Sequence, residues 1–201
     1  MAAETDKPIE AVSAVLGWER WLQLDAGDSR AARARLRRAA SAFDALLLAE
    51  THVLIRAVHV TGDKRLPRDA DERLAVLAMT LAHVERSSPT PFAAALGFGP
   101  HGGPPNLQEG ERPRLSPARF GALMRAVHSR DWDRFARASR RAVAILGDSA
   151  FNVPRFVRDV LSMNDRTLQR WTYQYWQTDA PPELAEKPAP NLSSNETESI
   201  P

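Results

Sequence analysis

Apolar residues recur at intervals of three and four along almost the whole chain, whereas the strict alternation that marks a β-strand is nearly absent. Prolines, glycines and helix-capping residues separate these periodic segments. Because this spacing brings apolar side chains to one face of a helix, it predicts an all-α protein. Hydrophobic residues make up 43% of the 201 positions, which is enough to fill a core.

The helix boundaries follow from capping residues and from prolines, which are favoured in the first helical turn. Ser116-Pro117 and Asn152-Val153-Pro154 are such starts, and Asp69 or Asp71 begins an earlier helix. The expected helices cover residues 8–24, 30–40, 43–60, 69–84, 92–96, 117–128, 131–147, 155–163 and 165–177.

One segment interrupts the helical pattern. Residues 97–114 contain four prolines and five glycines, which predicts a flexible loop. We therefore expect two small helical bundles, an N-terminal lobe over residues 1–96 and a C-terminal bundle over residues 115–178. Residues 179–201 are rich in proline, serine and acidic residues, and we expect a disordered tail there.

The charges are unevenly distributed. The net charge is +2, but residues 179–201 contain five acidic residues and one lysine, which leaves 26 bases and 20 acids before them. Residues 112–170 hold 13 arginines and 5 aspartates. A GC-rich genome favours arginine codons but does not explain this clustering. Because the planar guanidinium matches phosphate oxygens, the clustering favours a polyanionic partner.

Residues 130–146 show this pattern best. The face expected to be buried comprises Trp132, Phe135, Ala136, Ser139, Ala142, Val143 and Leu146. Arg130, Arg134, Arg137 and Arg141 recur on the opposite face, and Arg140 lies on the flank. This ladder contains no acidic residue, so its like charges repel one another unless a polyanion lies against them. A solvated basic face is the simpler alternative, but similar arginine spacing on neighbouring helices favours binding.

The sequence lacks the residues that several classes of function require. The chain has no cysteine, and no two of its five histidines stand three or four residues apart, the spacing of metal ligands on one helix. No phosphate-binding glycine loop or nucleophile elbow is present. We therefore expect a non-catalytic protein without a metal or other cofactor. Residues 1–8 lack the features of a signal peptide and no apolar run could span a bilayer, so we expect a cytoplasmic protein without a membrane partner.

The order of several motifs resembles the CasB family, the small subunit of the type I-E CRISPR complex called Cascade. The motifs are Leu36-Arg37-Arg38-Ala39, the segment 119–125, the pair Arg140-Arg141, Asn152-Val153-Pro154 before the segment 156–161, and Trp171 with Tyr175-Trp176. The resemblance covers about residues 9–177. Met163-Asn164 departs from the family pattern, and residues 97–114 have no clear counterpart in it.

This resemblance implies a non-enzymatic subunit made of two helical bundles. Two copies would lie head to tail, in contact with the large subunit and with the backbone subunits that hold the guide RNA. The subunit would stabilise the R-loop and hold the displaced non-target DNA strand in antiviral defence. The arginines carried over from the family are Arg37, Arg38, Arg119, Arg140, Arg141, Arg158 and Arg166. The helical pattern adds Arg134 and Arg137.

Three other functions remain open from the sequence. A free-standing helical DNA-binding regulator would need Asn or Gln among its arginines to read bases, and the ladder has none. A protein-interaction bundle could present its basic face to an acidic protein. A metal-dependent hydrolase would need ligands scattered along the chain.

Overall fold

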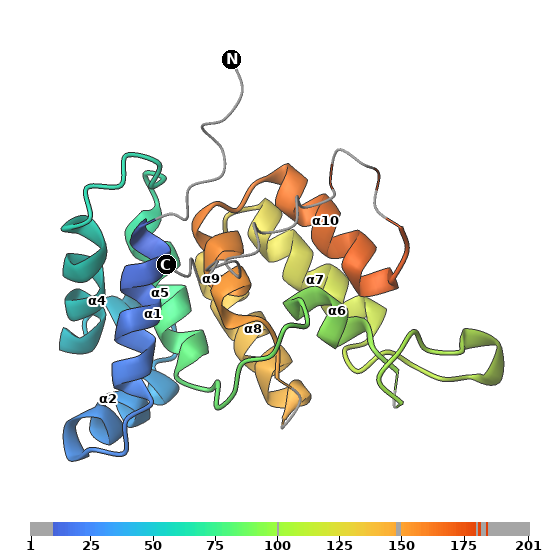
Figure 1. Cartoon of the computed structure of the whole chain (residues 1–201), viewed down its shortest axis with the longest axis horizontal. Coiled ribbons are helices and arrows are strands. Elements are labelled where there is room, and N and C mark those ends of the chain that lie inside the picture. Colours follow the sequence, from blue (N-terminus) through green and yellow to red (C-terminus); the bar gives the residue numbers. More distant parts are fainter. Residues whose placement is uncertain (1–9, 100, 148–149, 180, 182–183, 185–201) are drawn as a thin grey trace, which may run out of the picture.

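The computed structural model describes residues 10–99, 101–147, 150–179, 181 and 184. Within these residues it contains ten α-helices, a short 3-10 turn and no β-strand, which confirms the all-α prediction (Figure 1). The first five helices are α1 (Glu10–Leu22), α2 (Gly27–Arg38), α3 (Ala42–Leu46), α4 (Ala49–His59) and α5 (Ala70–Leu81). The others are α6 (Phe92–Gly97), α7 (Pro117–His128), α8 (Trp132–Leu146), α9 (Val153–Leu161) and α10 (Asp165–Trp176).

The single helix expected over residues 43–60 is wrong, because the chain forms two helices there. Leu48 is extended, with φ −91° and ψ 134°, and it separates α3 from α4. The Oγ atom of Ser41 caps α3 by accepting a hydrogen bond from the backbone N–H of Asp44 at 3.0 Å. The break lets α3 pack against α5 and α8 while α4 packs against α1 and α5. The apolar run did not reveal the break, because both short helices bury part of it.

Helix α5 lies at the centre of the molecule (Figure 1). Every residue from Arg73 to Leu81 is buried, and α5 packs against α2, α3, α4, α8 and α9. A helix that is buried on all sides needs neighbours from both halves of the chain. Buried residues from α1 to α10 accordingly belong to one continuous hydrophobic cluster.

The expected division into two bundles is not confirmed by this packing. Helix α6 precedes the glycine- and proline-rich segment but packs against α10, at the other end of the chain. A side chain at Gly97 would place its Cβ only 1.9 Å from the carbonyl oxygen of Tyr175, so α6 needs glycine there. The boundaries at residues 96 and 115 remain a prediction.

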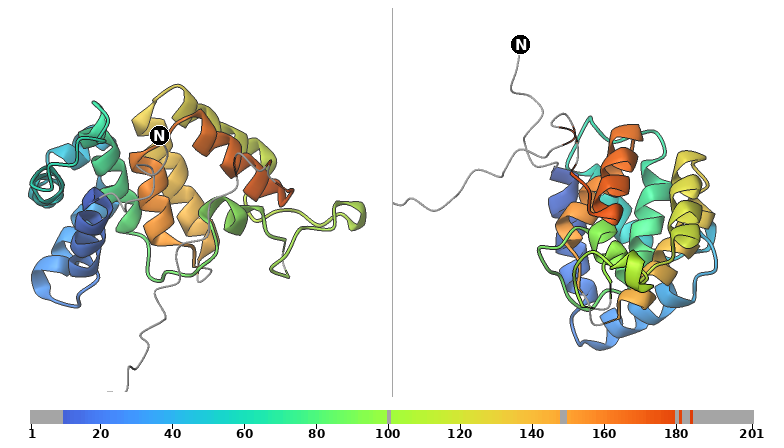
Figure 2. Two further views of the ribbon diagram at one scale, coloured as in Figure 1. Left: turned by 45° about the horizontal axis from the view of Figure 1, so that its top comes forward. Right: turned by 90° about the vertical axis from the view of Figure 1, so that its right-hand side faces the viewer.

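The segment after α6 projects beyond α6 and α7, as Figure 1 and the left view of Figure 2 show. Backbone hydrogen bonds hold its base: Arg114 N–H donates to Phe98 O at 2.9 Å, and Leu115 N–H donates to Leu96 O at 3.0 Å. The flexibility expected for residues 97–114 remains a prediction. The expected disordered tail, residues 179–201, lies outside the described residues except for Asp179, Pro181 and Leu184.

Arg73 joins three helices inside the core. Its Nη1 atom donates to the carbonyl oxygens of Val160 and Leu161, both at 3.0 Å, where α9 ends. Its Nε atom donates to Asp69 Oδ1 at 3.0 Å, and its guanidinium carbon lies 4.8 Å from the centre of the Trp132 ring. Arg73 is only 5% exposed. These contacts offset the free-energy cost of burying its positive charge. None of the described helices is long and apolar enough to cross a membrane.

Candidate nucleic-acid interface

Helix α8 carries the arginine ladder, with one change from the prediction. Asp131 is the N-cap, and its Oδ1 atom accepts a hydrogen bond from Arg134 N–H at 2.9 Å. Arg130 precedes the helix and has a φ of 54°, so it is not part of the ladder. Arg134, Arg137 and Arg141 are exposed. All seven residues of the expected buried face are buried, as predicted.

Arg119 of α7 and Arg141 of α8 line the same groove. This hollow between the two helices, here called the α7–α8 groove, has a volume of about 430 Å³. Its other lining residues are Leu115, Ala122, Ala138, Ala144 and Ile145. The alanines leave room between the helices, so the floor is apolar. Within the described part of the chain, no acidic side chain pairs with either arginine.

Arg37 and Arg140 lie in a different environment, where α2, α5 and α8 meet (the α2–α5–α8 junction). Arg140 Nη1 donates to Ala39 O at 2.5 Å, and its Nη2 donates to Arg37 O at 2.8 Å, at the end of α2. Arg37 Nε donates to Ala82 O at 2.6 Å, at the end of α5. Carbonyl groups at helix C-termini carry partial negative charge and lack helical partners. Both guanidinium groups therefore already bind backbone atoms of the protein.

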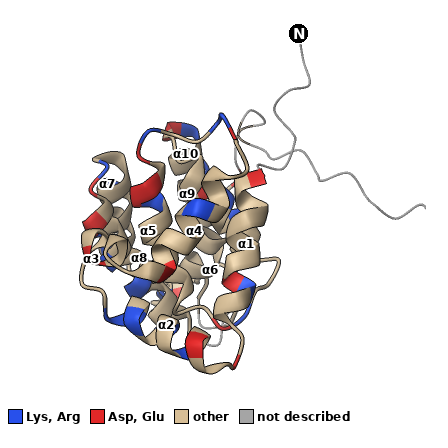
Figure 3. Cartoon of the chain, turned by 90° about the vertical axis from the view of Figure 1, so that its left-hand side faces the viewer, with Lys and Arg blue, Asp and Glu red and all other residues tan. Residues whose placement is uncertain are grey.

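Burial changes the protonation equilibria at this junction. It lowers the pKa of the half-buried Arg140 guanidinium. Burial also lowers the pKa of His83 to about 4, with a smaller contribution from the positive charges of Arg140 and Arg37. His83 is therefore neutral at pH 7, and the junction carries its positive charge on arginine. Figure 3 shows Lys and Arg positions in blue where α2 and α8 approach each other.

The remaining predicted arginines lie outside the α7–α8 groove. Arg38 is exposed at the last residue of α2. Arg158 is exposed on α9, which packs against α1, α5 and α6, and Arg166 is exposed in the first turn of α10. The structure thus brings Arg119, Arg134, Arg137 and Arg141 onto the α7 and α8 surface, but it does not gather all nine predicted residues into one site.

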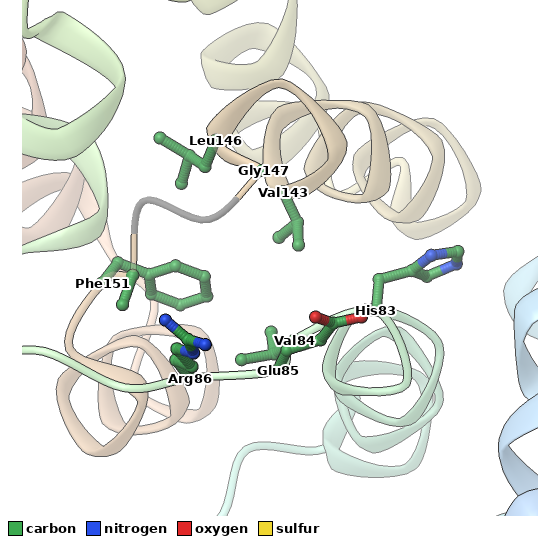
Figure 4. A pocket seen from close by; sticks show the side chains of 9 residues that line it. His83, Val84, Glu85, Arg86, Val143, Leu146, Gly147 and Phe151 are labelled. Carbon is green, nitrogen blue, oxygen red and sulfur yellow. The ribbon is translucent and has the colours of Figure 1, made fainter.

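A second hollow lies between the end of α5 and the end of α8, beside Phe151 (Figure 4). Its volume is only about 20 Å³, which holds about one water molecule. In Figure 4 the His83 side chain points away from the other lining residues. Among the residues with a described position, no three or more potential metal ligands lie together. A volume of about 20 Å³ is too small for a substrate molecule.

The sequence interpretation missed two features. It did not identify Arg73 as a buried residue. The available signal was that Arg73 directly precedes an apolar run, whereas Arg68, the other arginine between Leu66 and Leu81, does not. It also missed the groove floor. The signal for the floor was the presence of Ala138, Ala144 and Ile145 beside the arginine ladder, where a fully solvated helix face would carry polar side chains.

Comparison with known protein families supports one identification. The model of the family CRISPR-associated protein Cse2 matches residues 32–176, about 72% of the chain. The match includes α8, the α7–α8 groove and all nine predicted arginines. A comparison with curated proteins found no match, and neither did a comparison with solved structures. Cse2, also called CasB, is the small subunit of the type I-E Cascade complex and is not a known family of enzymes. The match to most of the chain shows that this protein belongs to the family of CRISPR-associated protein Cse2.

Proposed function

We propose that this small subunit binds nucleic acid, without sequence preference, through the α7–α8 groove and the exposed face of α8. One observation supports this proposal most: Arg119, Arg134, Arg137 and Arg141 are exposed on two adjacent helices, and none has an acidic partner among the described residues. Repulsion between such charges falls when phosphate groups lie against them. Arg38, Arg158 and Arg166 lie on α2, α9 and α10, so any contact that they make with nucleic acid would be separate from this surface.

The function that follows is stabilisation of the R-loop in RNA-guided antiviral defence. The hybrid of guide RNA and target DNA is about as stable as the DNA duplex that it replaces, so opening is nearly balanced. A few contacts to the displaced non-target strand are then enough to shift this balance. The chain would act by binding, without catalysis and without a cofactor. Its protein partners would be the large subunit, the backbone subunits and a second copy of itself.

Two of the arginines suggested by the resemblance fit this function less well. Arg37 and Arg140 donate to backbone carbonyls at the α2–α5–α8 junction, and Arg140 uses both terminal nitrogens to do so. Moving either group to a phosphate would leave helix C-terminal carbonyls without partners. We therefore assign these two arginines to the stability of the subunit and the outward-facing ones to nucleic acid.

The test is a titration of assembled Cascade with target DNA, using Arg119→Ala combined with Arg141→Ala. The matched control is Arg56→Ala combined with Arg68→Ala, which removes two exposed charges outside α7 and α8. We expect the groove variant to bind target DNA about tenfold more weakly, with a shallower dependence on salt because about two phosphate contacts are lost. Both variants should assemble normally.

Equal target-DNA affinity for the groove variant and the control would refute the assignment to this groove. Loss of assembly in the groove variant alone would instead favour the protein-interaction alternative. Tight binding of the isolated subunit to one particular duplex sequence would favour the regulator.

A further inference from the structure

The α7–α8 groove combines two kinds of unsatisfied surface. Its floor is apolar and formed by Leu115, Ile145 and three alanines, whereas Arg119 and Arg141 carry positive charge at the same place. The floor is only partly exposed, and phosphate groups would satisfy the arginines without covering it. The best occupant has acidic and apolar side chains within a short segment.

The chain itself leaves α10 beside this groove. The Tyr175 hydroxyl donates to Leu115 O at 2.6 Å, and Leu115 lines the groove. The Tyr175 ring also stacks on Phe120 of α7, with 3.9 Å between ring centres. Helix α10 ends one residue later, at Trp176. The residues that follow therefore start from a point fixed at the Leu115 end of the groove.

The length of the following segment is sufficient to reach the whole groove. Residues 177–201 amount to 25 positions. Ten extended residues span about 33 Å, whereas the 12 residues of α7 extend for about 18 Å. Reaching Arg119 and Arg141 from the end of α10 thus requires only part of this segment.

The composition of this segment matches the groove. Residues 179–201 contain Asp179, Glu183, Glu186, Glu196 and Glu198 against a single base, Lys187. Leu192 stands four positions before Glu196, and Ile200 stands two positions after Glu198. Carboxylates suit the two arginines, and the apolar side chains suit the floor between them.

We propose that the α7–α8 groove is the docking site of this chain's own acidic C-terminal segment, in the part that follows Leu184, residues 185–201. Because the segment is tethered beside the groove, its effective concentration there is on the order of millimolar, so a weak contact is enough for substantial occupancy. If the proposed function holds, the segment competes with nucleic acid for Arg119 and Arg141. Docking itself does not depend on that function.

The absence of cysteine from the chain allows a direct test. We would introduce Ser194→Cys in the acidic segment together with Ala144→Cys in the groove and measure disulfide formation in the full chain under mild oxidation. The matched control pairs Ser194→Cys with Ala57→Cys, an exposed position on α4. The groove pair is expected to crosslink at least about tenfold faster than the control pair, because docking raises the local concentration of the two thiols.

A second comparison ties the result to charge. Arg119→Gln with Arg141→Gln, or about 1 M salt, should bring the rate of the groove pair close to that of the control. Equal rates for the groove and control pairs in the unmodified background would overturn the proposal. A faster groove rate that is unaffected by both charge changes would overturn its electrostatic basis.

Nucleic acid enters only in the last step, so the two proposals fail separately. Single-stranded DNA should slow crosslinking of the groove pair if it binds the same arginines. A groove rate that stays high while DNA is bound would keep the docking site and refute the use of this groove for nucleic acid.

Discussion

Arg140 and Arg141 are adjacent in the sequence but have opposite environments. Arg140 is half-buried at the α2–α5–α8 junction and donates to two carbonyl groups of the α2 C-terminal turn. Arg141 is exposed and lines the α7–α8 groove, without an acidic partner in the part of the chain that the structure describes. One residue corresponds to a rotation of about 100° around the helix, which is enough to separate an internal contact from a surface.

The comparison shows that arginine has two distinct uses in this fold. At the junction, and at Arg73 in the core, guanidinium groups bind carbonyl oxygens where helices end. On α7 and α8 they project into solvent, where they are available to an external anion. The first group should affect the free energy of unfolding, and the second group should affect binding.

The largest effect on stability is expected for Arg73→Met. This change leaves Asp69 without its partner in a partly buried site and removes the donor from the carbonyls of Val160 and Leu161. The free energy of unfolding should fall by about 3 kcal/mol or more. Urea denaturation measures this loss, with Arg137→Met, an exposed change on α8, as the control expected to stay within about 0.5 kcal/mol. A loss no larger than that of the control would show that the core tolerates the unpaired groups.

A smaller effect is expected for Arg140→Met, which tests the junction directly. We expect the free energy of unfolding to fall by about 1–3 kcal/mol, because two carbonyls at the end of α2 lose their donor. Arg141→Met should change stability by less than about 0.5 kcal/mol while weakening target-DNA binding by the assembled complex. The reverse pattern, with Arg140 controlling binding and Arg141 controlling stability, would contradict the comparison.

The smallest effect concerns pH and His83. Burial and the neighbouring Arg140 and Arg37 lower the pKa of His83 to about 4 from 6.5, so the unfolded state binds the proton more readily than the folded state. The contribution of His83 to the free energy of unfolding is therefore fully present above pH 6.5, and it is lost as the pH falls towards 4. Since His83 is only half-buried, solvent screening should limit the loss to about 1–2 kcal/mol.

The variant His83→Asn should show a correspondingly shallower loss of stability on acidification, as measured by urea denaturation at several pH values. Parallel pH profiles for the variant and the original chain would mean that the His83 pKa is not lowered in the folded protein.

Periodicity predicted most of the fold because the buried faces are local patterns. The buried face of α8 was predictable from spacing alone, and so was the helix start at Asn152-Val153-Pro154. The break at Leu48 was not, since it depends on α3 and α4 meeting different neighbours. The glycine- and proline-rich segment suggested two bundles, but the packing of α6 against α10 is a contact between distant parts of the chain that composition does not encode.

The site was predictable in part for the same reason. The exposed positions of Arg134, Arg137 and Arg141 follow from the helix period. The internal roles of Arg37 and Arg140 do not, because their partners are carbonyl oxygens 45 to 103 residues away in the sequence. A backbone acceptor carries no side-chain signature, so arginines that bind helix ends look like arginines that bind phosphate until the packing is known.

The contacts of α8 with the turn between α2 and α3 have a consequence for folding. Asp133 Oδ1 accepts a hydrogen bond from the backbone N–H of Ala42 at 2.6 Å, and Arg140 donates to Ala39 O and Arg37 O. These bonds close a corner in the first quarter of the chain with residues that lie 91 to 103 positions later. During synthesis the corner lacks these partners until α8 has left the ribosome. Its backbone amides should consequently gain their full protection from hydrogen exchange only after most of the polypeptide has been made.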